Sequence, residues 1–152
     1  MENWFDDDWS GVKLYPKSDN PCFGCGGANP RGMHLEFERD DARQRIVGRF
    51  RLGEEYQGGS GYLRGGIIAL LLDEAMSKAS GFYDEHAVTA ELRIEYKRPI
   101  PATSEIVVEG FVTRREGRQL YHEGEIRNEG GDLLARGEGR FVIVDRTRFG
   151  KQ

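Results

Sequence analysis

Two carboxylic acids, Asp73 and Glu74, stand in a strongly apolar stretch and are the residues best placed to do chemistry in this sequence. Five apolar residues, Ile68 to Leu72, come directly before them. A carboxylate that is taken out of water costs several kcal/mol unless it is paired or its pKa shifts, and poor solvation raises its basicity. Asp73 therefore needs either a structural partner, such as a buried arginine, or a role in catalysis.

The stretch that carries these acids is predicted to form the one long helix of the chain. Gly66 to Ala79 contains no proline, few β-branched residues and apolar side chains on nearly every face. We therefore expect a helix that is buried on most of its circumference. Gly65 and Gly66 precede its first turn, where backbone N–H groups lack intrahelical partners and favour negative charge. Gly81 is expected to end the helix in the left-handed conformation.

The other elements expected from the sequence are six β-strands, because six stretches alternate between apolar and polar residues. They cover residues 33–39, 44–52, 86–98, 105–113, 119–127 and 133–145. The connections are short, so neighbouring strands must be mostly antiparallel. The order β-β-α-β-β-β-β predicts an α+β domain in which an antiparallel sheet wraps around one central helix. The open edges of such a sheet favour pairing with a second subunit.

The 152 residues are expected to form one domain with two short extensions. We predict an N-terminal arm over residues 1–21, loose or lying over the surface of the domain. The domain itself is predicted over residues 22–146, and residues 147–152 form a C-terminal tail without a pattern. The acidic N-terminus lacks the layout of a signal peptide.

The composition of the chain limits its partners. Acidic residues number 26 and basic residues 22, which gives a formal net charge of -4. Dispersed bases in an acidic chain do not favour a nucleic-acid surface. No apolar run approaches the roughly 20 residues needed to span a bilayer. We therefore expect a cytoplasmic protein without nucleic-acid or membrane partners.

Cys22 and Cys25 form a single Cys-x-x-Cys motif in a Gly-rich turn. A structural zinc site usually has four ligands, and the three histidines supply no second matching pair. A redox role would want the motif beside a βαβ unit, which the sequence does not show. We interpret the pair as two reduced cysteines and expect no metal site.

Several motifs of this chain resemble one known family. A loop ending in Gly65-Gly66 is followed by a buried helix with Asp73 eight residues after the first glycine, and then by Leu-x-Ile-x-Tyr-x-x-Pro from Leu92 to Pro99. Together these features resemble the hotdog-fold acyl-CoA thioesterases, in particular the group related to phenylacetate-pathway thioesterases. The opening Cys-Phe-Gly-Cys-Gly and the Asn-Pro-Arg-Gly-Met of residues 29–33 resemble the start of the domain in a subset of them. The resemblance covers about residues 22–144.

The resemblance implies hydrolysis of an acyl-CoA thioester to a free acid and coenzyme A, without a further cofactor. It implies that the Asp73 carboxylate acts as general base or nucleophile, and that the Gly65 N–H of the partner subunit points at the thioester oxygen. It also implies that Thr89 places a hydroxyl near the attacking water, and that the protein is a homodimer or homotetramer. The substrate-binding residues that we expect with these are Gln57, Arg64, Gly66 and Arg98.

Arg64 departs from the family pattern, because these thioesterases usually carry histidine before the two glycines. An arginine is always charged and cannot act as a base, but its planar fork suits a carboxylate or a phosphate of coenzyme A. The substitution keeps open a non-catalytic hotdog protein that binds an acyl group or acyl-CoA. A hotdog hydratase is a further alternative, but that chemistry commonly uses an Asp-His pair and no histidine stands in the predicted helix.

The remaining polar candidates have structural interpretations. Glu74 is expected to be satisfied by a neighbour or to face solvent, since adjacent helix residues point in different directions. Thr89 is also typical of a β-branched strand residue without a chemical role. We assign no role to the three histidines, His34, His86 and His122.

Overall fold

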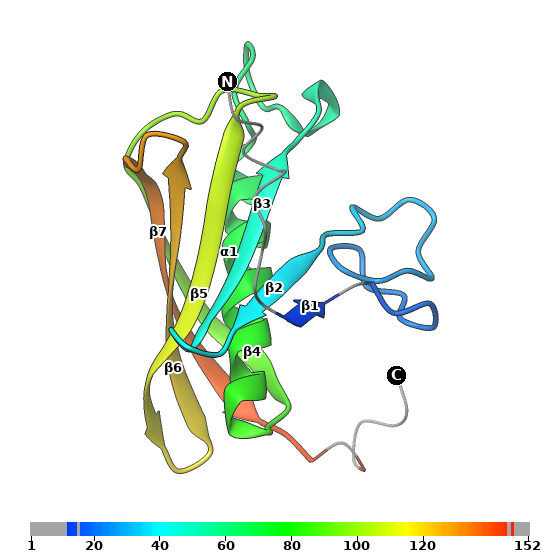
Figure 1. Ribbon diagram of the computed structural model, residues 1–152, viewed down its shortest axis with the longest axis vertical. Helices are drawn as coiled ribbons and strands as arrows, with labels where there is room; N and C mark the ends of the chain where they lie inside the picture. The colour runs from blue at the N-terminus through cyan, green and yellow to red at the C-terminus, as the bar shows by residue number, and fades with distance from the viewer. Residues whose placement is uncertain (1–11, 15, 146, 148–152) are drawn as a thin grey trace.

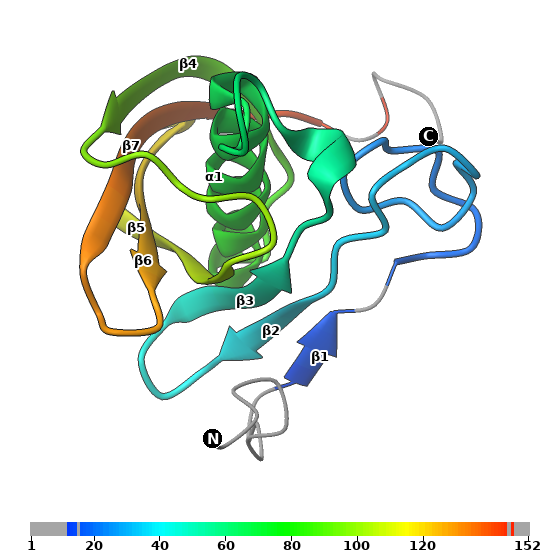
Figure 2. The same ribbon diagram turned by 90° about the horizontal axis from the view of Figure 1, so that it is seen from above.

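A seven-stranded antiparallel sheet curls around one α-helix in the computed structural model, which describes residues 12–14, 16–145 and 147. The helix lies in the hollow of the sheet (Figures 1 and 2). The sheet order is β1-β2-β3-β5-β6-β7-β4. This arrangement confirms the predicted α+β hotdog fold. The elements are β1 (Val12–Leu14), β2 (Phe37–Asp40), β3 (Arg45–Arg51), η1 (Glu54–Tyr56), α1 (Gly65–Ala79), η2 (Ser80–Tyr83), β4 (Ala87–Tyr96), β5 (Glu105–Glu116), β6 (Gln119–Asn128) and β7 (Leu133–Ile143).

The core lies between α1 and the concave face of the sheet. The helix contributes fully buried side chains that include Leu71, Leu72 and Met76, and each such residue stabilises the fold by about 1.5 to 3 kcal/mol. Gly110 of β5 lets the helix approach closely, since a Cβ atom there would lie 2.4 Å from the carbonyl carbon of Ala75. Among the described residues, no helix has the length and apolar character of a transmembrane segment.

The strands differ from the sequence prediction mainly at their ends. The predicted strand 33–39 begins only at Phe37, because the residues before it belong to the preceding loop. Strand β5 continues to Glu116, so the predicted five-residue turn shrinks to two residues, with Gly117 at φ +57°. Residues 12–14 of the predicted arm form β1, which pairs with β2. Residues 1–11 of that arm and 148–152 of the tail lie outside the described residues.

The end of α1 corrects the prediction for Gly81. The chain does not turn into the left-handed conformation there but continues from Ser80 to Tyr83 as a single 3-10 turn. Asp84 then adopts the left-handed conformation, with φ +53° and ψ +29°. A short polar side chain such as aspartate tolerates this region better than most non-glycine residues.

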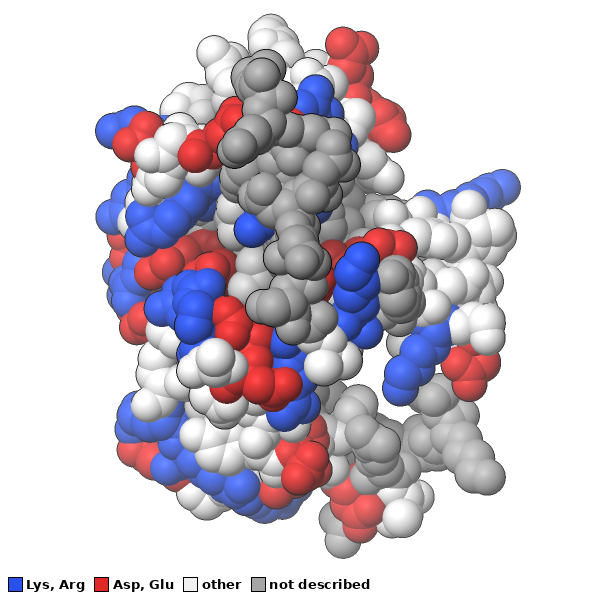
Figure 3. Space-filling view, viewed as in Figure 1, with Lys and Arg blue, Asp and Glu red and all other residues white. Residues whose placement is uncertain are grey.

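The outer face of the sheet carries acidic and basic side chains next to one another (Figure 3). Arg43 and Arg45 both pair with Glu109, at 3.1 and 2.6 Å, and Arg136 pairs with Glu123 at 2.7 Å. Such partly exposed pairs each stabilise a fold by no more than about 1 kcal/mol.

Strand β4 forms one edge of the sheet and has a single strand neighbour, β7, among the described residues. It runs back alongside α1, with Thr89 near the middle of the helix and Tyr96 at the helix N-terminus. Two of its apolar side chains are strongly exposed, Val88 at 44% and Tyr96 at 54%. An edge that presents unpaired backbone groups and apolar side chains is a ready surface for another strand.

Candidate active site

The structure brings together two of the three predicted catalytic residues, Asp73 and Thr89. Asp73 lies half-buried on the side of α1 that faces β4. The Thr89 hydroxyl donates a hydrogen bond of 2.7 Å to its Oδ1 atom. Thr89 itself is exposed, so the carboxylate lies at the edge of the sheet rather than inside the core. The pair is accessible from the β4 edge.

Burial is the main cause of a raised pKa at Asp73. Hydrogen bonds from Thr89 and Ser77 act in the opposite direction, and the negative charge of Glu74 adds to the increase. The described part of the chain offers Asp73 no arginine or lysine ion pair, so the structural alternative of a buried Arg partner finds no support. A carboxylate in this environment is more basic than an ordinary aspartate.

The N-terminus of α1 is open. Arg64 is the N-cap residue, with an extended backbone at φ −64° and ψ 139°, and its side chain does not cap the helix. Among the described residues, the N–H groups of Gly65 and Gly66 have no hydrogen-bond acceptor. The hydroxyl of Tyr96 donates a hydrogen bond of 2.8 Å to the Gly65 carbonyl and so fixes this turn against β4. Two free donors at a helix N-terminus can stabilise a developing oxyanion.

Gly65 and Asp73 do not meet within one subunit. They are eight residues apart on the same helix, which corresponds to about 12 Å along its axis. A single carbonyl group cannot contact both over that distance. The third predicted catalytic residue is therefore separated from the other two in this chain.

The predicted substrate-binding residues lie away from Asp73. Gln57 is exposed, and its side-chain oxygen accepts a 3.0 Å hydrogen bond from the N–H of Gly61, in the loop that leads to α1. Arg64 is exposed at the start of α1 and forms no ion pair with a described residue. Arg98 pairs with Asp132 at 3.4 Å. Gln57, Arg64 and Gly66 thus surround the helix N-terminus, and their binding role stays a prediction.

Tyr96 is a site residue that sequence reasoning missed. It appeared only as a letter of the Leu-x-Ile-x-Tyr pattern, whereas its hydroxyl holds the Gly65 turn. The signal that could have found it is a tyrosine at the end of the strand that follows the helix, since the end of that strand returns to the two glycines at the start of the helix.

Glu74 points to a different side of α1 and faces the Cys-x-x-Cys turn. Its carboxylate pairs with Lys78 at 3.1 Å and accepts a hydrogen bond from the Cys22 thiol at 3.5 Å, so it is satisfied by neighbours as expected. Cys22 and Cys25 are free thiols and half-buried. Burial raises the pKa of Cys25 to about 12, although the hydrogen bond and charge of Lys78 lower it.

His122 is a buried histidine that anchors α1 to the sheet. Its side chain on β6 stacks on Phe141 at 4.3 Å, and its Nδ1–H donates to the Met76 carbonyl at 2.5 Å. The residue is 1% exposed, and burial lowers its pKa to about 4. The ring is therefore neutral near pH 7 and belongs to the core rather than to the candidate site.

This environment predicts an acid-sensitive fold. The pKa of His122 is about 4 in the folded chain and about 6.5 when it is unfolded, so the unfolded chain binds more protons between these values. Its contribution to stability is complete above about pH 6.5 and falls by about 2 to 3 kcal/mol on acidification to about pH 4.5. Urea unfolding of the wild type and of His122→Asn at both pH values measures this loss. Equal losses in the two proteins would contradict the assignment.

The comparisons with known sequences identify one family. The family model described as the thioesterase superfamily matches residues 60–135. Acyl-coenzyme A thioesterase THEM4 from Bos taurus is 32% identical over 115 residues, which cover 75% of this chain and 47% of that protein. The Rattus norvegicus THEM4 is 39% identical over 92 residues, which cover 59% of this chain and 40% of that protein. The chain thus spans less than half the length of these curated relatives.

Solved structures agree with this match. A crystal structure of a thioesterase superfamily protein superimposes with a TM-score of 0.72 at 30% identity, covering 77% of this chain and 57% of that chain. The E. coli PaaI protein from the phenylacetic acid degradation operon superimposes with a TM-score of 0.63 at 20% identity, covering 67% of this chain and 74% of that chain. At 20% identity the second likeness shows the fold alone.

Proposed function

This chain belongs to the thioesterase superfamily, and from that membership we propose that it hydrolyses acyl-CoA thioesters to a free acid and coenzyme A. The observation that carries the proposal is the 2.7 Å hydrogen bond that holds the Asp73 carboxylate at the exposed edge of the sheet. The relatives named acyl-coenzyme A thioesterases support the same reaction.

In the proposed reaction, Asp73 removes a proton from water while the water oxygen attacks the thioester carbonyl carbon. Thr89 holds Oδ1 of the carboxylate, which orients the group toward the substrate. The tetrahedral oxyanion accepts a hydrogen bond from the N–H of Gly65, and such donors contribute about 3 to 4 kcal/mol. The carbon–sulfur bond then breaks, and the departing sulfur receives the proton from Asp73. Direct attack by the carboxylate to form an anhydride is the alternative route for the same residues.

The site requires two subunits, because Gly65 and Asp73 are about 12 Å apart in one chain. We propose a homodimer in which β4 pairs antiparallel with β4 of the partner. A two-fold axis near the middle of the strand would place the Thr89 end of one strand beside the Tyr96 end of the other. Since Tyr96 holds Gly65, that pairing carries the partner's Gly65 toward Asp73. A homotetramer would be a pair of such dimers.

Arg64 suggests a second candidate function, the binding of acyl-CoA without hydrolysis. We propose that its exposed guanidinium binds a phosphate of coenzyme A, with Gln57 and Gly66 contacting the acyl-CoA near the same helix end and Arg98 binding a further phosphate. Because Arg64 cannot replace a histidine as a base, the same residue favours a non-catalytic acyl-CoA binding protein as the alternative.

A panel assay separates the two functions. The purified protein is incubated with short, long and aromatic acyl-CoAs, and released thiol is measured. Turnover of any of these substrates supports the hydrolase. No turnover across the panel, together with a rise in melting temperature on addition of acyl-CoA, would replace it with the binding protein.

The raised pKa of Asp73 predicts the shape of the pH profile. The base must be deprotonated, so kcat/KM should fall as the pH drops through that pKa, at a higher pH than for an ordinary aspartate. The Thr89 hydrogen bond lowers the pKa of Asp73. In Thr89→Val the acid limb of the profile, where kcat/KM falls with falling pH, should therefore move to still higher pH. Rate profiles of the wild type, Thr89→Val and Thr89→Ser measure the shift, and Thr89→Ser should keep the wild-type limb. Identical limbs in all three proteins would contradict this role.

A further inference from the structure

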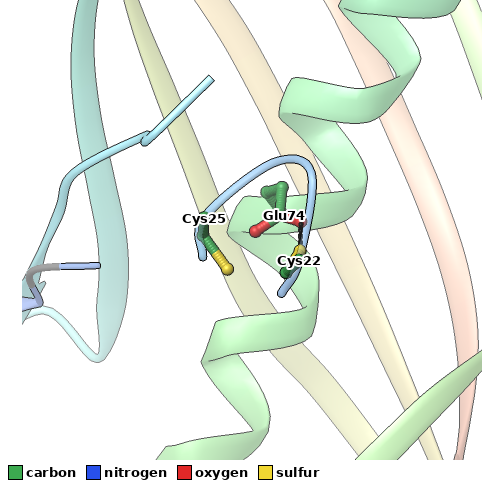
Figure 4. A group of neighbouring side chains, drawn as sticks. All are labelled: Cys22, Cys25 and Glu74. Carbon is green, nitrogen blue, oxygen red and sulfur yellow. Dashed lines mark hydrogen bonds between the residues drawn. The ribbon is translucent and has the colours of Figure 1, made fainter. Parts of the chain in front are cut away.

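We propose that Cys22, Cys25 and Glu74 form a zinc site that fastens the N-terminal loop to helix α1. One ligand atom from each residue lies within 4.8 Å of the other two. Figure 4 shows the turn with both cysteines lying against α1, where the carboxylate of Glu74 meets them. The site lies on a different side of the helix from the Asp73–Thr89 pair, and the inference does not depend on the proposed hydrolysis.

The spacing of the donor atoms suits a tetrahedral zinc ion. Zinc binds thiolate sulfur at about 2.3 Å and carboxylate oxygen at about 2.0 to 2.2 Å, so the two donors stand about 3.6 Å apart. The Cys22 Sγ and the Glu74 Oε1 are already 3.5 Å apart. The Cys25 Sγ lies within 4.8 Å of both and needs to approach by no more than about 1 Å, which a side-chain rotation can supply. Three protein ligands leave the fourth position to water.

Two glycines shape the turn around this cluster. The N–H of Gly26 donates to the carbonyl of Cys22 at 2.9 Å, and a Cβ atom on Gly26 would lie 2.4 Å from the Cys22 nitrogen. A Cβ atom on Gly24 would lie 2.5 Å from Oε1 of Glu74. Glycine at position 26 therefore lets the backbone close around the two cysteines, and glycine at position 24 leaves the Glu74 carboxylate in its place beside them.

Lys78 balances the charge of the proposed site. Two thiolates and one carboxylate carry three negative charges, and a zinc ion leaves one of them uncompensated. The Lys78 Nζ lies 3.1 Å from Oε2 of Glu74 and supplies the missing positive charge. Since Lys78 holds Oε2 and Cys22 faces Oε1, one carboxylate oxygen is directed at the sulfur atoms.

The loop has few apolar attachments to the core, of which Met33 is one. No apolar side chain of the described residues between Pro16 and His34 belongs to the buried core, and Phe23 is 45% exposed. Backbone hydrogen bonds from Met33 to Phe23 and from Leu35 to Gly24 join the two limbs of the loop to each other. Metal ions commonly stabilise segments that cannot bury an apolar core of their own. The prediction of no metal considered only cysteine and histidine, whereas the fold adds Glu74 as the third donor.

Zinc content of the full chain tests the proposal. The reduced protein is incubated with zinc chloride, freed of unbound metal and analysed by mass spectrometry, and about one zinc per chain is expected. Cys22→Ser, Cys25→Ser and Glu74→Gln should each lose most of this zinc. Glu129→Gln, which changes an exposed acid in the turn between β6 and β7, should keep it. Substitution by cobalt(II) should give a sulfur-to-metal charge-transfer band in the wild type and not in a double cysteine variant.

Zinc binding is measured directly on the wild type, so the proposal can be tested even if a variant folds poorly. Zinc should raise the melting temperature of the wild type and of Glu129→Gln and leave the cysteine variants unchanged. Reduced wild-type protein that retains no more zinc than the double variant would overturn the proposal. A cobalt spectrum without a sulfur band would overturn it as well.

Discussion

Asp73→Asn is expected to lower kcat/KM for acyl-CoA hydrolysis by about 10²- to 10⁴-fold, the usual effect of losing a positioned general base. Asparagine has the shape of aspartate and keeps an oxygen for the Thr89 hydrogen bond of 2.7 Å. It cannot take a proton from water or attack the carbonyl carbon. The loss should therefore appear in the chemical step, while acyl-CoA still raises the melting temperature. Release of free thiol under steady-state conditions measures the rate.

Asp41→Asn is the matched control for this experiment. Asp41 lies in the turn after β2, is exposed, and pairs with Arg39 at 2.7 Å. The same chemical change there should leave the rate within about twofold, because exposed pairs contribute little to stability. Full activity in both Asp73→Asn and Asp73→Ala would remove Asp73 from the mechanism.

The sequence predicted the central helix almost to the residue because its signal is local. The apolar run and the glycines that precede it are read within one segment, and α1 indeed spans Gly65–Ala79. The strands from β3 to β7 were also found, since alternation is likewise local. What these patterns could not supply is the register and the position of each strand in the sheet, which depend on contacts between distant segments.

The features that were missed depend on distant neighbours. Strand β1 has only three residues and no alternation of its own, and it becomes a strand because β2 offers it an unpaired edge. The left-handed residue is Asp84 rather than Gly81, because a single 3-10 turn follows the helix. Glycine adopts the left-handed conformation easily, but a glycine after a helix does not have to adopt it.

In the candidate site, too, residues with a sequence signal were found and contacts between distant segments were missed. Asp73 and Thr89 were singled out through the family resemblance, and the fold brings them into contact across 16 positions of sequence. The contact between Cys22 and Glu74 spans 52 positions and has no sequence signal, because neither residue type nor spacing links them. The structural role of His122 was missed for the same reason, since it depends on Met76 lying directly above β6.

Gly65→Pro is expected to lower kcat by about 10²- to 10³-fold by removing the N–H that the mechanism directs at the oxyanion. Proline is well tolerated at the first position of a helix, where the N–H has no intrahelical partner. The extended backbone of Arg64, at φ −64° and ψ 139°, is also the conformation that a following proline favours. The variant should therefore fold with nearly unchanged stability while it loses activity.

Gly65→Ala is the control for this substitution, because alanine keeps the N–H. A Cβ atom at this position would lie 3.5 Å from the Tyr96 ring, which is an ordinary contact. Gly65→Ala should keep most of the wild-type rate. If Gly65→Pro and Gly65→Ala were equally active, the oxyanion would be stabilised by another donor.

Mixing the two inactive proteins tests whether each site is shared between subunits. In a dimer of one Asp73→Asn chain and one Gly65→Pro chain, one site carries both changes and the other site carries neither. Random exchange makes half of the dimers mixed, and half of their sites are intact, so about a quarter of the wild-type activity should return. If Gly65 and Asp73 acted within the same chain, every site would keep one defect and the mixture would stay inactive. Recovery of activity would thus place the partner's Gly65 opposite Asp73 and make the β4 edge a part of the active site.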